Sequence, residues 1–172
     1  MEKEEKTEEK RGNFEKELEK LKSAYSIFQK KYSLPSFERL AEDFDIDKLA
    51  YKRGSFILRD IRRTMNDRLN SYMSIFETFL NPSNSPSFVL NLLKHVSKEE
   101  SKEIKEIYKV ISKIQIKSIE VDVNYDEKKE AEYIKSIINE WHVLKQKIYA
   151  IAKELEGKMY KSEDEKERGY FG

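Results

Sequence analysis

The feature of this chain that most limits its fold is a run of 70 residues, from Ser87 to Glu156, without glycine or proline. These two residues end or interrupt helices, so their absence over such a length favours long helices. The whole chain of 172 residues holds only 5 glycines and 3 prolines. We therefore expect an all-α protein whose breaks fall where the prolines and glycines lie.

The spacing of apolar residues predicts where the helices lie. In the first and last of them, apolar residues recur at alternating intervals of four and three, which is the heptad pattern of a packing helix. We expect a mostly antiparallel bundle of five or six helices, in which these two are long and heptad-patterned. Such stripes also pack across a dimer, so the chain is a monomer or a homodimer, and we favour packing within one molecule. The approximate predicted ranges are 13–32, 35–43, 55–80, 86–96, 97–123 and 124–160.

Helix caps support several of these boundaries. The sequence Ser97-Lys98-Glu99-Glu100 has the form of a capping box, in which a serine and a glutamate three residues later satisfy each other's backbone amides. Asn124 with Glu127 suggests a similar start for the last helix, and Asn13, Ser55 and Ser85 are further candidate N-caps. Residues 114–125 alternate like a strand, but no partner strand is evident, so we favour a helix ending at 121–123.

The charged ends of the chain differ from its middle. Residues 1–12 and 161–172 are rich in charge and poor in apolar side chains, so we expect them to be disordered tails. Residues 13–160 are long enough for one domain with a real core. The sequence therefore predicts a single helical domain between two tails.

Composition excludes several classes of function. The net charge is only +1, there is no cysteine, and no apolar run approaches the roughly 20 residues that span a bilayer. We expect a cytoplasmic protein without membrane contact. Glycine-rich phosphate loops are missing, His95 and His142 lack metal-ligand spacing, and the acidic turn 43–47 lacks the glycine and distal acid of a calcium loop. We therefore predict no catalytic residues, no metal ligands, no cofactor and no enzymatic activity.

The candidate functional feature is a cluster of arginines. Five of the eight arginines fall between Arg53 and Arg68, whereas the other 26 positive charges are lysines. Arginine binds carboxylates and phosphates with two parallel hydrogen bonds, which lysine cannot do. On a helical projection Arg59, Arg62 and Arg63 share a face, with Asn66 one turn further on. This face lies about 130° from the apolar centre, which predicts that these side chains point to solvent. The predicted partner-binding residues are Arg53, Arg59, Arg62, Arg63 and Asn66.

Two interpretations of this cluster remain open. The preceding segment 34–47 holds five negative charges and one positive, so Arg59 or Arg63 can pair internally with its carboxylates. Arg68 falls on the apolar face and is expected to be paired or to extend its guanidinium to the edge. If the arginine face is not paired within the chain and can bind a partner, we expect a protein-interaction module or adaptor. The alternative is a nucleic-acid-associated protein that binds phosphates with the same face.

Three segments prompt a comparison with known families. They are YSLPSFERLAEDFDID, ILRDIRRTMNDRL and DEKKEAEYIKSIINEW, with Leu34-Pro35-Ser36-Phe37, Ile61-Arg62-Arg63 and Trp141 as the main residues. Over about residues 32–155 the chain resembles a family of small, uncharacterised archaeal helical proteins. The Leu34-Pro35 entry, the arginine-bearing long helix and the later Ser97-x-Glu99-Glu100 helix start are similar to the helical domain of archaeal GINS replication subunits. The first resemblance implies an archaeal origin and a helical fold, but neither implies an activity, a cofactor or a set of site residues.

Overall fold

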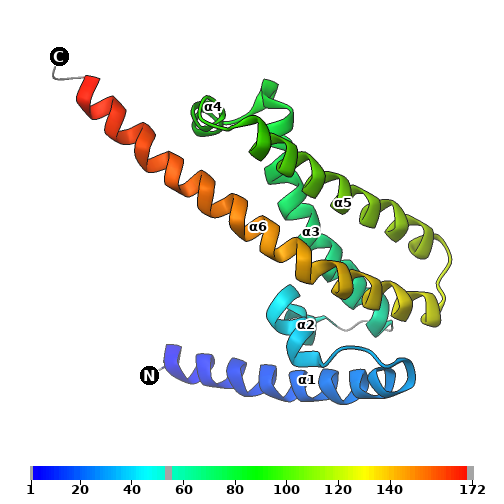
Figure 1. Cartoon of the computed structure of the whole chain (residues 1–172). Coiled ribbons are helices and arrows are strands. Elements are labelled where there is room, and N and C mark those ends of the chain that lie inside the picture. The colour runs from blue at the N-terminus through cyan, green and yellow to red at the C-terminus, as the bar shows by residue number, and fades with distance from the viewer. Residues whose placement is uncertain (1, 53–55, 170–172) are drawn as a thin grey trace. The chain divides into compact units, whose positions relative to one another are not determined.

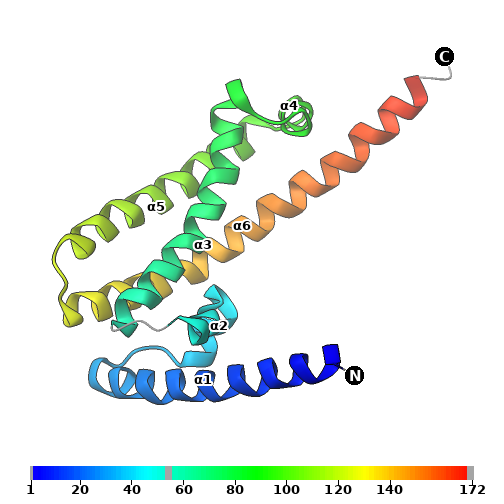
Figure 2. The same ribbon diagram turned by 180° about the vertical axis from the view of Figure 1, so that it is seen from behind.

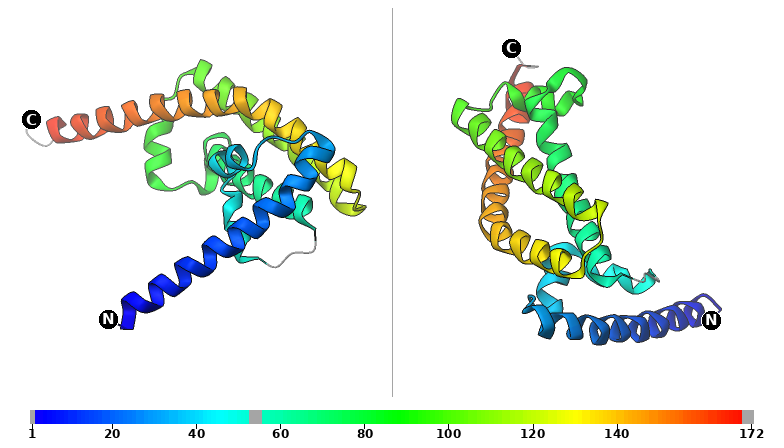
Figure 3. Two further views of the ribbon diagram at one scale, coloured as in Figure 1. Left: turned by 90° about the horizontal axis from the view of Figure 1, so that it is seen from below. Right: turned by 90° about the vertical axis from the view of Figure 1, so that its right-hand side faces the viewer.

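The computed structural model describes residues 2–52 and 56–169, and the side chains of residues 11–52, 56–83 and 85–159. Within these residues the protein is all-helical and contains no strand (Figure 1). Figures 2 and 3 show from other directions that the long helices are uninterrupted ribbons. The α-helices are α1 (Glu2–Tyr32), α2 (Phe37–Phe44), α3 (Ile57–Leu80), α4 (Ser87–Leu93), α5 (Lys98–Val123) and α6 (Glu127–Gly169), and the 3₁₀-helices are η1 (Ile46–Tyr51) and η2 (Pro82–Asn84).

Two local predictions are confirmed by the structure. The segment 114–123 is helical, because α5 continues to Val123. The capping box at the start of α5 also forms: the amide of Glu100 donates to Ser97 Oγ over 3.1 Å, and the amide of Ser97 donates to Glu100 Oε2 over 2.6 Å. These two bonds satisfy amides that have no partner within the helix.

Three predicted caps are wrong. Asn13 does not cap the first helix, because α1 already begins at Glu2. Asn124 does not cap the last helix, because Asp126 Oδ1 accepts the amide of Lys129 at 2.8 Å. Ser85 does not cap α4; its hydroxyl instead donates to the carbonyl of Thr78 over 2.6 Å. The predicted cap at Ser55 lies outside the described residues, and the disordered tails and the single domain remain predictions.

The chain divides into two compact units. The first comprises Met1–Arg68 with Lys117–Ile138, and the second comprises Leu69–Ile116 with Asn139–Gly172. Each unit therefore contains parts of α3, α5 and α6.

The first unit holds α1, α2 and η1 together through a small aromatic and aliphatic core. Tyr25 of α1 is fully buried, donates a hydrogen bond to the carbonyl of Pro35 over 2.8 Å, and meets Phe37 edge to face at 5.8 Å. Ser33 adopts a positive φ of 52° at the end of α1, which turns the chain toward α2. The other buried apolar residues here include Leu34, Leu40, Phe44, Ile46, Leu49, Leu58, Ile61, Met65, Val121, Ile134 and Ile137.

The same unit ties the end of α1 to the start of α6 through hydrogen bonds. Glu127 accepts from Lys31 Nζ and from Tyr32 Oη, each over 2.7 Å, and Lys135 Nζ donates to the carbonyl of Tyr32 over 3.0 Å. The hydrogen bond from Lys31, followed by that from Tyr32, lowers the pKa of the Glu127 carboxyl. The last turn of α1 is thus fixed by side chains from α6.

The second unit has an apolar core and an open groove. Its core side chains include Leu69, Phe76, Val89, Leu92, Ile104, Ile107, Ile111, Ile114, Trp141, Leu144 and Ile151. Tyr72 lies against Trp141 with ring centroids 5.9 Å apart. A groove of about 450 Å³ opens between α3, α4 and α6, and its walls include Ile75, Phe79, Phe88, Leu155 and Met159. Among the described residues, no helix combines the length and the apolar composition that crossing a bilayer requires.

Candidate functional site: an arginine network and its exposed rim

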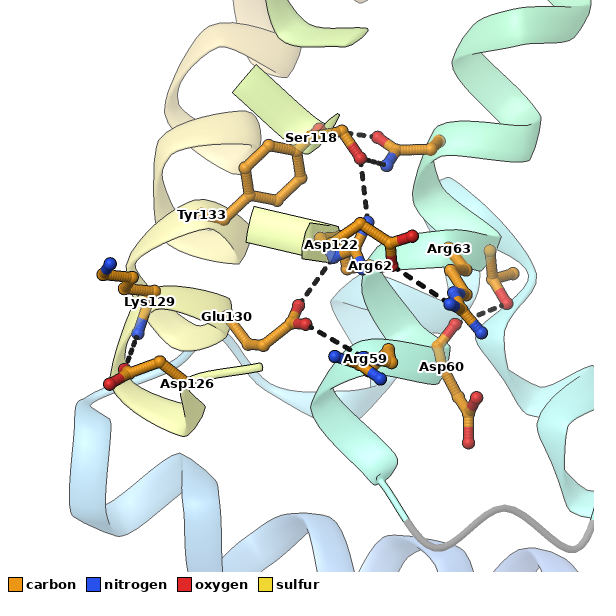
Figure 4. A network of polar contacts seen from close by, with 12 residues as sticks. Arg59, Asp60, Arg62, Arg63, Ser118, Asp122, Asp126, Lys129, Glu130 and Tyr133 are labelled. Atoms are coloured by element: carbon orange, nitrogen blue, oxygen red, sulfur yellow. Dashed lines mark hydrogen bonds and ion pairs between the residues drawn. The ribbon is translucent and has the colours of Figure 1, made fainter. Parts of the chain in front are cut away.

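The arginine cluster of α3 lies in the first unit, and its central member is buried. Arg62 is 2% exposed, although the helical projection places it far from the apolar face. The reason is that α3 has two covered faces in this unit. One packs on apolar side chains, and the other meets polar side chains of α5 and α6 (Figure 4).

Three side chains satisfy the Arg62 guanidinium. Its Nε donates to Glu130 Oε2 over 2.7 Å, its Nη1 to Ser118 Oγ over 2.8 Å, and its Nη2 to Asp122 Oδ1 over 2.5 Å (Figure 4). Glu130 is fully buried, and Asp122 is 44% exposed. A buried charge is tolerated only when it is paired and hydrogen-bonded, and Arg62 meets both conditions.

Asn66 and Tyr133 extend this network by one turn along α3. Asn66 lies one turn after Arg62 and is 6% exposed. Its amide nitrogen donates to Ser118 Oγ over 2.5 Å, and its amide oxygen accepts from Tyr133 Oη over 2.7 Å. Burial raises the pKa of the Tyr133 hydroxyl, so it is a neutral donor over the physiological range. Ser118 therefore joins Arg62 and Asn66 through a single oxygen.

The charges in the network stabilise one another. Burial alone would lower the pKa of Arg62, but hydrogen bonds to Glu130 and Asp122 raise it. The hydrogen bond from Arg62, followed by that from Arg63, lowers the pKa of Asp122. Arg63 contributes through Nη2, which lies 3.0 Å from Asp122 Oδ1. The network thus keeps the Arg62 guanidinium protonated and the Asp122 carboxylate ionised at neutral pH.

Arg59 marks the edge where the network meets solvent. Its Nε lies 3.6 Å from Glu130 Oε1, which is within ion-pair range but too long for a hydrogen bond. Both of these atoms are buried and make no hydrogen bond to the described residues. The guanidinium carbon lies 4.7 Å from the ring centroid of Tyr125 and 5.5 Å from that of Phe56. The Arg59 guanidinium is thus held by two aromatic rings and one carboxylate.

We call the accessible part of this site the rim, defined as Phe56, Arg59, Arg63 and Tyr125. The two rings contact each other with centroids 4.5 Å apart. Phe56 is 45% exposed, Tyr125 is 38% exposed and the Arg63 side chain is 53% exposed. The rim therefore presents aromatic surface and a guanidinium group, with the buried network behind it.

The structure corrects the predicted position of two residues. Arg62 and Asn66 do not point to solvent, because Ser118, Asp122 and Glu130 surround their polar groups. Arg53 lies outside the described residues. Arg59 and Arg63 remain partly accessible, and a role for these five residues in binding a partner stays a prediction.

Arg59 and Arg63 form ion pairs within the chain, as one interpretation predicted, but their partners differ from the predicted ones. Arg59 and Arg63 pair with Glu130 and Asp122, and not with the acidic segment 34–47. Arg68 does pair with that segment, because its Nη1 lies 3.2 Å from Asp45 Oδ2. Arg68 is 44% exposed, which fits the expectation that it reaches the edge of the apolar face.

Sequence reasoning missed Ser118, Asp122, Glu130 and Tyr133. A signal for two of them exists in the apolar stripes. Ser118 occupies a core position in the series Ile114, Ser118, Val121 of α5, and Glu130 lies four residues before the buried Ile134 of α6. A polar residue at a core position of a helix needs a buried partner. An arginine on a neighbouring helix is the natural candidate, and Arg62 fills that role.

Comparisons with known proteins give no information on the family or function of this chain. No protein-family model, no curated protein and no solved structure matches this chain. The resemblances to an archaeal helical family and to the GINS helical domain therefore remain predictions. The site defines a helical protein with a buried arginine network and an exposed aromatic and arginine rim.

Proposed function

We propose that the protein is a non-enzymatic interaction module or adaptor, which binds an acidic segment of a protein partner through the rim. The observation that carries this proposal is the pair of exposed rings, Phe56 and Tyr125, which hold Arg59 between themselves and the buried Glu130. Tyrosine and arginine are among the residues that contribute most to binding at protein interfaces.

The order of the rim before binding favours this function. A side chain that is already held in place loses less conformational entropy when a partner binds. Arg59 is held by two cation–π contacts and one ion pair, and Arg63 by Asp122. The network behind the rim then acts as its support, so Arg62 and Asn66 contribute to binding only by positioning α3 and α5.

The charge of the rim indicates the chemistry of the partner. Its two guanidinium groups face one half-exposed carboxylate, Asp122, and one buried carboxylate, Glu130. Arg63 has further donors that Asp122 does not occupy, because an arginine carries five N–H groups. An aspartate or glutamate next to an apolar residue matches this surface, since its carboxylate reaches Arg63 while the apolar side chain covers the rings.

A defined peptide library tests the proposal. The purified chain is expected to enrich peptides that combine acidic and apolar residues, and the variants Arg63→Ala and Phe56→Ala are expected to lose this enrichment. Arg39→Ala is the matched control, because Arg39 is an exposed arginine of the same unit outside the rim. Equal enrichment by all four proteins, with unchanged helicity by circular dichroism, would rule the rim out as the binding surface.

A nucleic-acid-associated function is the second candidate, and the same observation favours it. Exposed rings stack on unpaired bases, and arginines bind the phosphates between them. Such binding weakens steeply as the salt concentration rises. A titration of labelled single-stranded RNA and DNA at two ionic strengths decides between the candidates. Binding at low salt that Phe56→Ala abolishes supports this one, and no binding at low salt removes it.

We also propose that the helices of this adaptor form the expected antiparallel bundle and that the protein is cytoplasmic. Small-angle X-ray scattering of the full chain tests the bundle, because helices that do not pack side by side give a larger radius of gyration than a packed bundle of the same helices. Imaging of a fluorescently tagged chain in its source cells tests the location.

A further inference from the structure

Helix α5 carries two separate apolar stripes. The first is buried and contains Ile104, Ile107, Ile111, Ile114 and Val121. The second consists of Ile116, Ile119 and Val123, which are 62%, 64% and 72% exposed. Their spacing of three and then four residues is again that of a heptad seam, and we call them the outer stripe.

The outer stripe is a distinct face of the helix. At 100° per residue its centre lies about 140° from the centre of the buried stripe, so the two do not merge at an edge. The helix is continuous from Lys98 to Val123, so the order of these side chains follows from helix geometry alone (Figure 1). Single exposed apolar residues are common, but three in heptad register on one helix indicate a partner helix.

Charged residues beside the outer stripe indicate which helix that partner is. Lys113 and Glu120 are exposed and lie one heptad apart on the same side of the stripe. They have opposite charge. In an antiparallel pair of identical helices, positions on the same side of the two seams face each other, so a lysine and a glutamate one heptad apart become opposite neighbours.

We propose that α5 binds α5 of a second copy of this chain, antiparallel and around a two-fold axis. Ile116 then packs against Ile119 of the second copy, and Ile119 against Ile116. Lys113 lies opposite Glu120 of the second copy, and this pair also occurs twice. The proposal goes beyond the function of the rim, because no residue of the rim belongs to the outer stripe.

A parallel pair of the same helices lacks this complementarity. In that arrangement Glu120 lies beside Gln115 of the second copy, and Lys113 lies beside Tyr108. Neither is a pair of opposite charges. The sign and spacing of Lys113 and Glu120 therefore select the antiparallel arrangement.

The expected dimer is weak and depends on concentration. Each copy contributes three apolar side chains and two ion pairs form, which places the contact below the roughly 1,200 Å² of a standard interface. Sedimentation velocity of the full chain over a wide concentration range is the appropriate measurement. A rise of the average mass toward that of a dimer supports the proposal, and a monomer at every concentration overturns it.

Point variants test whether the outer stripe makes the contact. Ile119→Lys places a charge in the seam and should weaken dimerisation by about tenfold or more, since a buried unpaired charge is costly. Tyr149→Lys is the matched control, because Tyr149 is also 64% exposed but lies on α6. An equal effect of the two changes, or no effect of Ile119→Lys, would contradict the proposal. Circular dichroism checks that each variant is folded.

A mixing experiment tests the antiparallel arrangement itself. The variants Lys113→Glu and Glu120→Lys each place like charges opposite each other, so each alone should dimerise more weakly than the wild-type chain. When the two variants are mixed, both contacts of the heterodimer again join a lysine and a glutamate. We expect the mixture to recover dimer formation to the wild-type level. Failure of the mixture to form more dimer than either variant alone would overturn the two-fold arrangement.

Discussion

The two units of this protein bury their segments of the same three helices in different ways. In the first, α3 meets α5 and α6 through Arg62 and its hydrogen bonds to Ser118, Asp122 and Glu130. In the second, the buried residues of these helices are nearly all apolar, among them Ile107 and Ile111 of α5 and Leu144 of α6. The helices of the first unit are thus joined by directional hydrogen bonds, whereas those of the second unit are joined by apolar packing that depends on shape and volume.

The difference concerns specificity more than total stability. A buried ion pair often contributes no more than well-packed apolar residues would, because both charges lose their hydration. Its hydrogen bonds, however, form in one register only, whereas apolar side chains tolerate small shifts. We infer that Arg62 sets how α3, α5 and α6 align in the first unit. This alignment then determines where the side chains of the rim lie.

The largest effect is expected for the loss of one partner in the buried pair. Arg62→Met leaves the fully buried Glu130 carboxylate without its main hydrogen-bond donor and should lower the free energy of unfolding by about 3–5 kcal/mol. Urea unfolding followed by circular dichroism measures this loss. Arg63→Ala is the control, since Arg63 is half exposed, and should cost less than about 1 kcal/mol. An equal loss of unfolding free energy in the two variants would show that the buried network does not differ from the exposed rim in its contribution to stability.

A core truncation in the second unit should have a graded effect instead. Ile107 is 1% exposed, so Ile107→Ala should cost about 2–5 kcal/mol and Ile107→Val about 0.5–1.5 kcal/mol. The loss follows the volume removed, because no hydrogen bond depends on this side chain. Chemical denaturation of both variants measures the ratio. A valine variant as unstable as the alanine variant would contradict a core that depends on volume.

A pH effect is expected from the start of α5 in the second unit. Burial alone would raise the pKa of Glu100, but hydrogen bonds from Lys158 and Ser97 lower it from 4.5 to about 2. Because the folded pKa is the lower one, the stabilisation is complete above pH 4.5 and is lost as the pH falls toward 2. Unfolding measured between these values should show a smaller decrease for Glu100→Gln than for the wild-type chain. An identical decrease in both would show that Glu100 does not titrate as proposed.

The smallest effect is expected at the groove of the second unit. Phe88 lies on its wall but is 56% exposed, so Phe88→Ala should cost less than about 1 kcal/mol. Phe76→Ala is the matched comparison, because Phe76 is 4% exposed and its loss should cost about 3–5 kcal/mol. Thermal unfolding of the two variants measures the contrast. A large loss at Phe88 would mean that the groove is part of the core.

The sequence predicted the helical class and much of the apolar face of each helix, because the period of these residues is a local property. It also predicted the capping box of Ser97 and Glu100, which involves residues three apart. It did not predict the burial of Arg62. A helical projection identifies the most apolar face, but it does not show that a second, polar face is covered by other helices. That information depends on pairs such as Arg62 and Glu130, which are 68 residues apart.

The candidate site was also predicted only in part: its location on α3 was predicted, but the burial of two of its residues was not. The arginine cluster located the correct part of α3, yet the sequence placed Arg62 and Asn66 on the surface with Arg59 and Arg63. The missing information was the set of partners on α5 and α6. Ser118 and Glu130 at core positions of their own helices were the available signals for that set.

A double-mutant cycle on Arg62 and Glu130 tests the central claim most directly. The free energy of unfolding is measured for the wild-type chain, for Arg62→Met, for Glu130→Leu and for the double variant. Each single change leaves a charge buried, whereas the double change removes both, so we expect the double variant to lose less than the two single losses together by about 2 kcal/mol or more. Losses that add to within about 0.5 kcal/mol would show that the two side chains act independently, and would contradict a buried network that positions the rim.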